Sequence, residues 1–475
     1  MERGHSNGFE QMKISPIIPL LILILSLGAF LRIHQMDKES IWTDEAVSLI
    51  EAEKDFPSLM PYLAKNEGFP FGYSLIMHSW IDLFGNSEFS IRFLSAIFGI
   101  ASILLMYLVG KEIFDKKAGL ISALLMSTAM LQIVYSQEAR PFAIFGFLAL
   151  LATYLFIKFL KNERNNLFLF SYIITIIISF YINYMALFLL IFHGAIFLFG
   201  YKNKIKKWLL SLLIIIPAIL PMLGFFVGQV FYKYPFWVQI LPKYGIPKFL
   251  ASLGNFLFLF PLFLLGILVL IIFILFQKKR ISFRKEDFKL FNKKRFILLL
   301  LFLGSIYLIV LDRIMISFTF VRISYFMVPI IYLVIAEGIT LFENKKVQAG
   351  IIIIILLFNA YTLSIYYRET TKNPWKIIVD DITQDSESLI IFEKVGLTGK
   401  FFFDYYSDKE VKILSLRSEE KTIDEETLKV FLADKEEFWL ISNNLGYKPF
   451  FDNNYKLESS EEYKKLIITK YKNEN

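Results

Sequence analysis

The chain has 475 residues, of which 56% are hydrophobic and 17% aromatic, and its mean hydropathy is +0.54. So much apolar surface exceeds what one ordinary soluble core can bury, and several runs are long enough to cross a bilayer. The composition therefore excludes a cytosolic globular enzyme and predicts a membrane protein. Because the chain contains no cysteine, disulfides, thiolate metal sites and cysteine nucleophiles are also excluded.

Apolar runs predict about eleven transmembrane helices, and hence an α-helical polytopic membrane protein. Runs such as Leu212–Val230 and Phe256–Phe276 hold almost no charge. The predicted spans are residues 15–34, 92–110, 118–135, 141–160, 167–182, 184–200, 208–228, 255–277, 296–311, 321–341 and 347–367.

Basic residues in the connections between these spans set the predicted orientation. With a cytoplasmic N-terminus, the inner connections carry 23 of the 35 Lys and Arg residues that precede residue 370. This asymmetry follows the positive-inside rule, and an odd number of spans then places the C-terminal tail outside the cytoplasmic membrane. Because topology explains the basic connections, nucleic-acid binding is not predicted.

The last part of the chain differs from the rest in composition. Residues 370–475 carry 16 Lys and Arg against 21 Asp and Glu and lack long apolar runs. We therefore divide the chain into a transmembrane domain, residues 1–369, and an extracytoplasmic soluble α/β domain, residues 370–475. In that domain the predicted strands are Leu389–Phe392, Val411–Leu416 and Phe438–Ser442, and the predicted helices are Trp375–Ile382 and Glu425–Ala433.

The first outer segment, about residues 35–91, is much longer than a connection between spans needs. Soon after the first span it carries the adjacent carboxylates Asp44 and Glu45. One interpretation is that both only favour the N-terminus of a helix at Ala46–Glu53. Long ordered loops are often functional, so a catalytic role is the alternative. The stretches Phe56–Ala64 and Tyr73–Phe84 are typical of helices that lie in the membrane interface.

Two further charged positions are expected at the same membrane face. The third span ends in Tyr135–Pro141, which contains Glu138 and Arg140, and the tenth begins near Arg322 and Tyr325. Glu138 and Arg140 could simply neutralise each other, and Arg322 could extend to lipid headgroups. Charge close to hydrocarbon is costly, however, and tends to be functional.

Carboxylates and arginines at one outer interface suit a definite reaction. A sugar linked to a lipid phosphate already has a good leaving group, which needs cationic stabilisation more than a proton donor. The acceptor hydroxyl needs a base, and a carboxylate can supply it. The pattern therefore predicts direct displacement with inversion at the anomeric carbon.

Several motifs together resemble the GT-C superfamily of membrane glycosyltransferases, in particular the group of protein mannosyltransferases and lipid A aminoarabinose transferases. The likeness extends over essentially the whole chain. The motifs that carry it are Trp42–Ala46, Phe69–Tyr73, His78–Trp80, Ser87–Arg92, Tyr135–Phe142, Arg322–Pro329 and Asn373–Lys376.

This resemblance implies transfer of a sugar from a polyprenyl-phosphate carrier to a lipid, protein or glycan acceptor. It implies Asp44 as the catalytic base and Glu138 as the second acidic residue of the site. Arg140 and Arg322 are implied as candidates for binding the lipid phosphate. The remaining substrate-binding candidates, which lie in the matching motifs, are Glu45, Tyr73 and Tyr325.

Some positions depart from the family pattern. Phe69 and Phe71 stand where many relatives have histidine and a second proline, and Asn183 stands where relatives often have histidine. The four histidines of the chain are too scattered to form a ligand cluster. No cofactor or metal site is therefore predicted with certainty, although a divalent metal stays an open alternative.

Two other functions fit parts of the pattern. A transporter or lipid flippase could use the outer charges as a gate, but the predicted spans are poor in ionisable residues midway across the membrane. A ligase that takes a diphosphate-linked glycan would differ from the first hypothesis only in its donor.

Overall fold

The structure is a computed structural model of the chain. It describes residues 16–66, 69–162, 164–200, 205–240, 325–370, 372–384, 389–393, 396–416, 423–442, 447–464 and 466–473. The predicted spans 255–277 and 296–311, the beginning of the tenth span and Arg322 lie outside the described residues.

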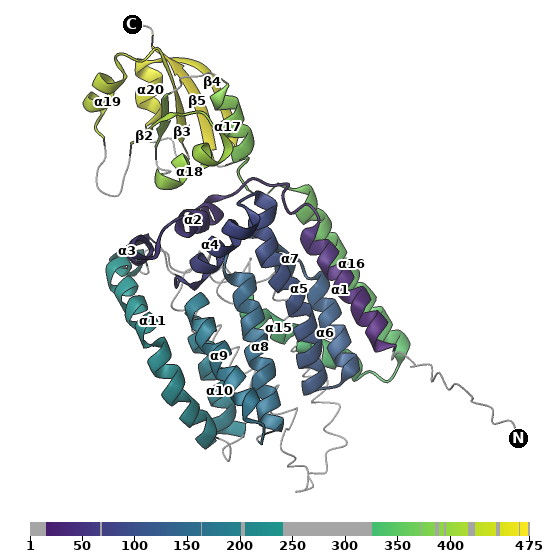
Figure 1. Cartoon of the computed structure of the whole chain (residues 1–475). Coiled ribbons are helices and arrows are strands. Elements are labelled where there is room, and N and C mark those ends of the chain that lie inside the picture. Colours follow the sequence, from purple (N-terminus) through teal and green to yellow (C-terminus); the bar gives the residue numbers. More distant parts are fainter. Residues whose placement is uncertain are drawn as a thin grey trace, which may run out of the picture.

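The first part of the chain forms a bundle of apolar helices, and α5 lies at its centre, packed against α1, α6 and α8 (Figure 1). Four described helices, α5, α8, α16 and the first part of α11, are long and apolar enough to cross a membrane, and the bent pair α6–α7 could make a fifth span. Each predicted span coincides, over its described part, with a helix or with this bent pair. The bundle helices are α1 Ile17–Ile33, α5 Glu88–Ile113, α6 Lys116–Thr128, α7 Met130–Ser136, α8 Phe142–Lys161, α9 Asn166–Ile182, α10 Ala186–Gly200, α11 Ile205–Ile240, α15 Val328–Thr340 and α16 Lys345–Arg368, with the 3-10 turn η2 Tyr325–Met327.

The predicted third span is not one straight helix, because α6 and α7 meet at an angle of 61°. The break frees carbonyl groups at the end of α6, and the fully buried Arg32 of α1 donates to two of them. Its Nη1 lies 3.0 Å from the Ser127 carbonyl oxygen and its Nη2 lies 3.1 Å from that of Met126. Carbonyl groups that have no hydrogen-bond partner within their own helix need another donor, particularly inside a membrane. Arg32 thus stabilises the bend between α6 and α7. The bend sets the direction in which α7 leads into residues 137–140.

Three short helices of the first outer segment lie across one end of the bundle: α2 Thr43–Ala52, α3 Phe56–Asn66 and α4 Gly72–Phe84. The two predicted interfacial stretches are therefore confirmed as helices. Figure 1 shows these helices between the bundle and the C-terminal domain, at the end where α1 and α16 meet that domain.

The C-terminal domain is a five-stranded sheet of order β2-β1-β3-β5-β4, with helices on both faces. β1 runs parallel to β2 and β3, and β5 runs antiparallel to β3 and β4. Alternating side chains of β1 face opposite layers: Leu389 and Ile391 pack with α19 and α20, and Ile390 and Phe392 with α17 and α18. The elements are α17 Trp375–Thr383, β1 Leu389–Phe392, α18 Gly396–Tyr406, β2 Lys412–Ser415, α19 Glu425–Leu432, β3 Glu437–Ser442, α20 Lys448–Asn454, β4 Lys456–Tyr463 and β5 Leu466–Lys472.

A glycine of α5 sets how closely α7 approaches. A Cβ added at Gly99 would lie 2.8 Å from the Ser136 Cβ and closer still to its Oγ. We therefore expect Gly99→Ala to push α7 away and to lower the free energy of unfolding by about 1–3 kcal/mol, as overpacking of a filled core does. Unfolding in detergent, followed by tryptophan fluorescence, measures this. Gly350→Ala in α16 is the control, because nothing lies within 4 Å of that added carbon; equal stability of the two variants would contradict the expectation.

Candidate active site

The acidic pair of the first outer segment lies in the first turn of α2. This helix begins at Thr43, three residues earlier than predicted, after Trp42 in an extended conformation. The Trp42 backbone N–H donates to Glu45 Oε2 at 3.4 Å, so the Glu45 side chain turns back over the helix start. Carboxylates in this turn also interact favourably with the helix dipole. The interpretation that the pair favours the start of a helix is thus confirmed for Glu45, whose side chain closes back on that start, and Asp44 lies in the same first turn.

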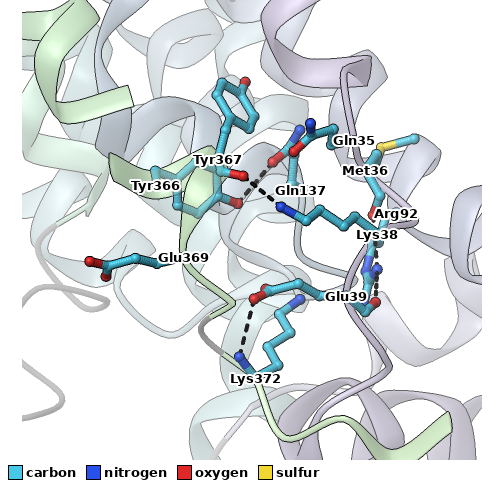
Figure 2. A pocket seen from close by; sticks show the side chains of 10 residues that line it. All are labelled: Gln35, Met36, Lys38, Glu39, Arg92, Gln137, Tyr366, Tyr367, Glu369 and Lys372. Carbon is cyan, nitrogen blue, oxygen red and sulfur yellow. Dashed lines mark hydrogen bonds between the residues drawn. The ribbon is translucent and has the colours of Figure 1, made fainter. Parts of the chain in front are cut away.

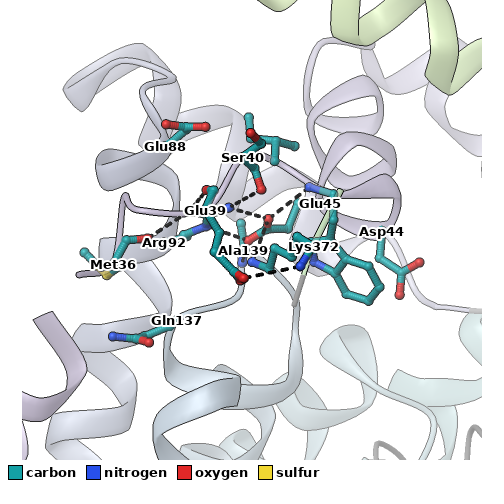
Figure 3. Close-up of polar contacts among 12 residues, drawn as sticks. Met36, Glu39, Ser40, Asp44, Glu45, Glu88, Arg92, Gln137, Ala139 and Lys372 are labelled. Carbon is teal, nitrogen blue, oxygen red and sulfur yellow. Dashed lines mark hydrogen bonds and ion pairs between the residues drawn. The ribbon is translucent and has the colours of Figure 1, made fainter. Parts of the chain in front are cut away.

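Glu45 is fully buried, and three partners outside α2 also hold its carboxylate (Figure 3). Arg92 binds both oxygens, with Nε 2.9 Å from Oε1 and Nη2 2.8 Å from Oε2. The Ala139 backbone N–H donates to Oε1 at 3.0 Å, and Lys372 Nζ lies 3.2 Å from Oε2. An enclosed carboxylate with this many donors is suited to positioning other groups. The prediction that Glu45 contacts substrate therefore has no support in this geometry.

Burial alone would raise the pKa of the Glu45 carboxyl, but the charges of Arg92 and Lys372 outweigh it and lower the pKa to about 2. A carboxylate with so low a pKa is a poor proton acceptor. If one member of the acidic pair is a base, Asp44 is the better candidate.

The lowered pKa predicts how the contribution of Glu45 to stability depends on pH. Because the pKa is lower in the folded than in the unfolded protein, the contribution is complete above the unfolded value of about 4.3 and is lost as the pH falls toward 2. The difference in free energy of unfolding between the wild type and Glu45→Gln should thus be constant above about pH 5.5 and shrink below pH 4. Denaturant titrations at pH 6, 4 and 3 measure it, with the exposed Glu369→Gln as control. A difference that stayed constant down to pH 3 would contradict this assignment.

The end of the third span meets α2, as the sequence predicts. The buried Arg140 donates from Nη1 to the carbonyl oxygen of Asp44 at 3.0 Å and to Ser48 Oγ at 3.0 Å. Its guanidinium group also lies over the ring of Phe69, 5.1 Å from the centroid. Arg140 therefore contacts α2 directly, and it fixes the backbone of the residue proposed as the base.

Glu138 lies between two anchored neighbours. Gln137 donates from Nε2 to the carbonyl oxygens of Arg32 and His34, at 3.0 and 2.9 Å, and accepts a hydrogen bond from the Tyr366 hydroxyl. On the other side, Ala139 is bound to Glu45. Glu138 itself is half-buried. The structure thus brings Asp44, Glu138 and Arg140 to one corner of the bundle.

Asp44 differs from Glu45 in exposure and direction. It is half-buried, and Figure 3 shows its carboxylate directed away from the ion pairs that surround Glu45. Adjacent positions on a helix point about 100° apart, which separates the two carboxylates. The Glu45 side chain therefore anchors the start of the helix, whereas the Asp44 carboxylate points away from these ion pairs.

The two tyrosines predicted to bind substrate are both enclosed. Tyr73 of α4 is 2% exposed, and burial raises the pKa of its hydroxyl well above the ordinary value. Tyr325 of η2 is 4% exposed and packs edge-on against Tyr135, with 4.8 Å between ring centroids. Tyr135 in turn contacts Phe142, which contacts Phe69 under Arg140. The site therefore rests on an aromatic cluster, Phe69, Tyr135, Phe142 and Tyr325, that links its elements.

Arg92 and Lys372 are residues of the site for which the sequence predicted no role. Arg92 begins the second predicted span, and an ionisable residue at such a place needs a partner. That signal points to some carboxylate without choosing among those of the outer segments. For Lys372 the sequence offers no comparable signal, because it is one of many lysines of the tail.

The described residues contain no group of three or more His, Asp or Glu side chains placed to hold a metal ion. Glu45 is committed to two cations and two backbone N–H groups, which leaves Asp44 and Glu138 as acidic side chains at the corner. Among the described residues, this donor set does not fit a three-ligand metal site.

Comparison with known proteins connects this geometry to a family. Residues 69–225 match the model of the family described as dolichyl-phosphate-mannose-protein mannosyltransferase. That match covers the α4 to α11 part of the bundle, including Arg92 and the corner at Arg140. No curated protein matches the sequence.

Solved structures extend the likeness to most of the chain. The archaeal oligosaccharyltransferase AglB from Archaeoglobus fulgidus, in complex with an inhibitory peptide and a dolichol-phosphate, has a TM-score of 0.54 at 13% identity, over 95% of this chain and 74% of that one. The oligosaccharyltransferase of the same organism in complex with Zn and sulfate has a TM-score of 0.53 at 14% identity, over 91% and 69%. The chain has a GT-C fold.

The GT-C resemblance inferred from the sequence motifs is thereby confirmed. The structure of ArnT from Cupriavidus metallidurans in the apo state is similar over 96% of this chain and 98% of that protein, with a TM-score of 0.49 and 10% identity. At such low sequence identity the similarity concerns the fold alone. The roles of the site residues therefore follow from their own geometry.

Proposed function

We propose that this protein is an inverting glycosyltransferase that moves a sugar from a polyprenyl-phosphate carrier to an acceptor hydroxyl at the outer face of the cytoplasmic membrane. The observation that supports this most is the corner where Arg140 binds the backbone of Asp44. It combines a presented carboxylate with a fixed cation at the end of a GT-C bundle. A carboxylate and a cation are the two groups that this reaction needs.

In the proposed reaction the acceptor oxygen attacks the anomeric carbon from the face opposite the phosphate. The bond between that carbon and the phosphate oxygen breaks, and the lipid phosphate leaves as an anion. Asp44 takes the proton of the acceptor hydroxyl as the new bond forms. Arg140 stabilises the negative charge of the phosphate, and Arg322, which lies outside the described residues, is proposed to assist it.

The remaining predicted residues receive supporting roles. Glu45 holds the start of α2 against Arg92 and Ala139, so that Asp44 is presented in a fixed direction. Glu138 is proposed to orient the acceptor beside Asp44. The enclosed Tyr73 and Tyr325 are proposed to shape the wall of the site by packing.

The membrane arrangement is part of the proposal. We propose eleven spans, with residues 1–369 as the catalytic domain and residues 370–475 as the extracytoplasmic domain. The N-terminus would be cytoplasmic. In support, the helices of the first outer segment and the C-terminal domain share one end of the bundle (Figure 1).

The partners of the reaction are the lipid-linked sugar donor, membrane lipid and an acceptor that could be a lipid, a protein or a glycan. A second candidate is a ligase for diphosphate-linked glycans. It uses the same corner and differs in the donor.

Reconstitution of the full chain in lipid vesicles tests the function. Vesicles are supplied with a panel of polyprenyl-monophosphate and polyprenyl-diphosphate sugars, and mass spectrometry follows the product and the released carrier. We expect glycosylated acceptor and free polyprenyl phosphate from a monophosphate donor. Turnover of diphosphate donors alone would favour the ligase. Movement of the carrier across the bilayer without any sugar transfer would favour a flippase and contradict the proposal.

A further inference from the structure

The connection between α16 and the C-terminal domain contacts the ion pair of Glu45 and Arg92. Lys372 lies in this connection, and its side chain is 12% exposed in the ion pair with Glu45. Its backbone N–H donates to Glu39 Oε1 at 3.3 Å, and the Lys376 backbone N–H donates to Ser40 Oγ at 3.1 Å. Figure 2 shows Lys372 and Glu39 facing each other in a small polar pocket between the ends of α1 and α16. The C-terminal domain is thus attached to the segment that leads into α2.

A second attachment lies on the domain itself, at the end of α18. The Tyr406 hydroxyl accepts a hydrogen bond from the Ile41 backbone N–H at 2.7 Å and donates to the Glu88 carboxylate. The neighbouring Tyr405 hydroxyl donates to the Asn86 carbonyl oxygen at 2.7 Å. The first outer segment is therefore bound by the C-terminal domain both before α2 and after α4.

Of these contacts, the one at Lys372 reaches the site itself. Glu45 is bound by Arg92 and Ala139 from the membrane bundle and by Lys372 from the C-terminal connection. A buried carboxylate is stable only when its charge is compensated and its oxygens are hydrogen-bonded. Lys372 supplies one of the two cations that do this. Glu45 follows Asp44 directly in the first turn of α2, so a shift of this turn after the loss of its anchor would move Asp44 as well.

We propose that Lys372 is a positioning residue for Asp44, and that docking of the C-terminal domain through it sets the geometry of the active site. The inference rests on the proposed function for the role of Asp44. It assigns to the C-terminal domain the task of holding the first turn of α2 in place through the Glu45 ion pair. Groups that must be held to within a fraction of an ångström lose much of their rate when a supporting contact is removed.

Three variants of the full chain in lipid vesicles test the proposal. Lys372→Met removes the ion pair, Lys372→Arg keeps the charge, and Lys376→Met is the matched control because that side chain is exposed. We expect Lys372→Met to lower kcat 10- to 100-fold with donor affinity changed less than threefold. Lys372→Arg should recover at least a third of the rate, and Lys376→Met should behave like the wild type. Retention of more than half the rate by Lys372→Met, or no recovery by Lys372→Arg, would overturn the proposal.

A combined variant separates positioning from a general loss of stability. If Lys372 acts through Glu45, then Lys372→Met should add less than a threefold further loss in a Glu45→Gln background. If the two losses multiply, Lys372 acts elsewhere and the proposal is wrong.

A structural measurement keeps this test independent of activity. The chain has no cysteine, so a single Ala46→Cys in α2, at a fully buried position, can be labelled specifically. We expect Lys372→Met to raise its rate of reaction with a maleimide at least fivefold, and Lys376→Met to leave it unchanged. An unchanged rate in Lys372→Met would overturn the positioning role. Faster labelling in a protein whose wild type transfers no sugar would instead reject the proposed function and keep the docking contact.

Discussion

Replacing Asp44 by asparagine is expected to lower the rate of sugar transfer by about 100- to 10,000-fold, which is the usual contribution of a general base. Asparagine has nearly the same shape but cannot accept the proton of the acceptor hydroxyl. The bond from Arg140 goes to the backbone carbonyl of Asp44 and is kept in the variant. Because the side chain is half-buried and directed away from the Glu45 network, we expect folding to be unaffected.

Single-turnover rates in vesicles, with donor in excess, measure this effect without interference from product release. The matched control is Asp82→Asn on α4, the same substitution in the same outer segment, at a side chain that is 66% exposed and pairs with His78. The control should transfer sugar at the wild-type rate. A rate for Asp44→Asn within threefold of the wild type, with an unchanged unfolding midpoint, would remove Asp44 as the base and leave Glu138 as the next candidate.

Much of the fold could be predicted from local signals in the sequence. Strand β1 begins at the predicted Leu389, where a short apolar run starts. Helix α17 begins at the predicted Trp375, directly after Pro374. Strand β4 was not predicted, since Lys456–Tyr463 is polar and exposed over almost its whole length. Such a sequence becomes a strand through pairing with β5, and its charges suit an edge position.

The bend at Ala129, inside the bundle, is a second feature that local sequence signals could not predict. The sequence from Lys116 to Ser136 contains no proline and reads as one apolar span. The break is stabilised by Arg32, which lies almost a hundred residues earlier and donates to the freed carbonyl groups. A contact between distant segments has no local pattern, so the periodicity of the span alone could not predict it.

In the candidate site, too, features with a local sequence signal could be predicted, whereas features that depend on distant contacts could not. Asp44 and the Glu138–Arg140 corner could be predicted because each lies in a short motif beside a span end. Glu45 was predicted to contact substrate because it shares the motif of Asp44. Its burial depends on Arg92 and Lys372, which are 47 and 327 positions away. Motifs therefore indicated where the candidate site lies, whereas the different surroundings of the two adjacent carboxylates are visible only in the tertiary structure.

Arg92 is the residue whose loss should damage stability most. All five of its N–H donors are used: two bind Glu45, and the others bind the carbonyl oxygens of Met36, Glu39 and Ser40 at 2.8, 2.7 and 3.1 Å. We expect Arg92→Met to lower the free energy of unfolding by about 3–5 kcal/mol, because it leaves a buried carboxylate with one cation fewer. Unfolding in mixed detergent, followed by tryptophan fluorescence, measures this loss. The exposed Arg368→Met at the end of α16 is the control.

Two further variants separate the charge of Arg92 from its geometry. Arg92→Lys keeps the charge but loses the planar group that reaches the three carbonyl oxygens, so a loss of about 1–3 kcal/mol should persist. The double variant Glu45→Gln with Arg92→Met removes the uncompensated carboxylate and should be more stable than Arg92→Met alone. If the double variant were less stable than the wild type by the sum of the two single losses, the two side chains would act independently. The ion pair would then not be what holds the first turn of α2 against the corner at Arg140.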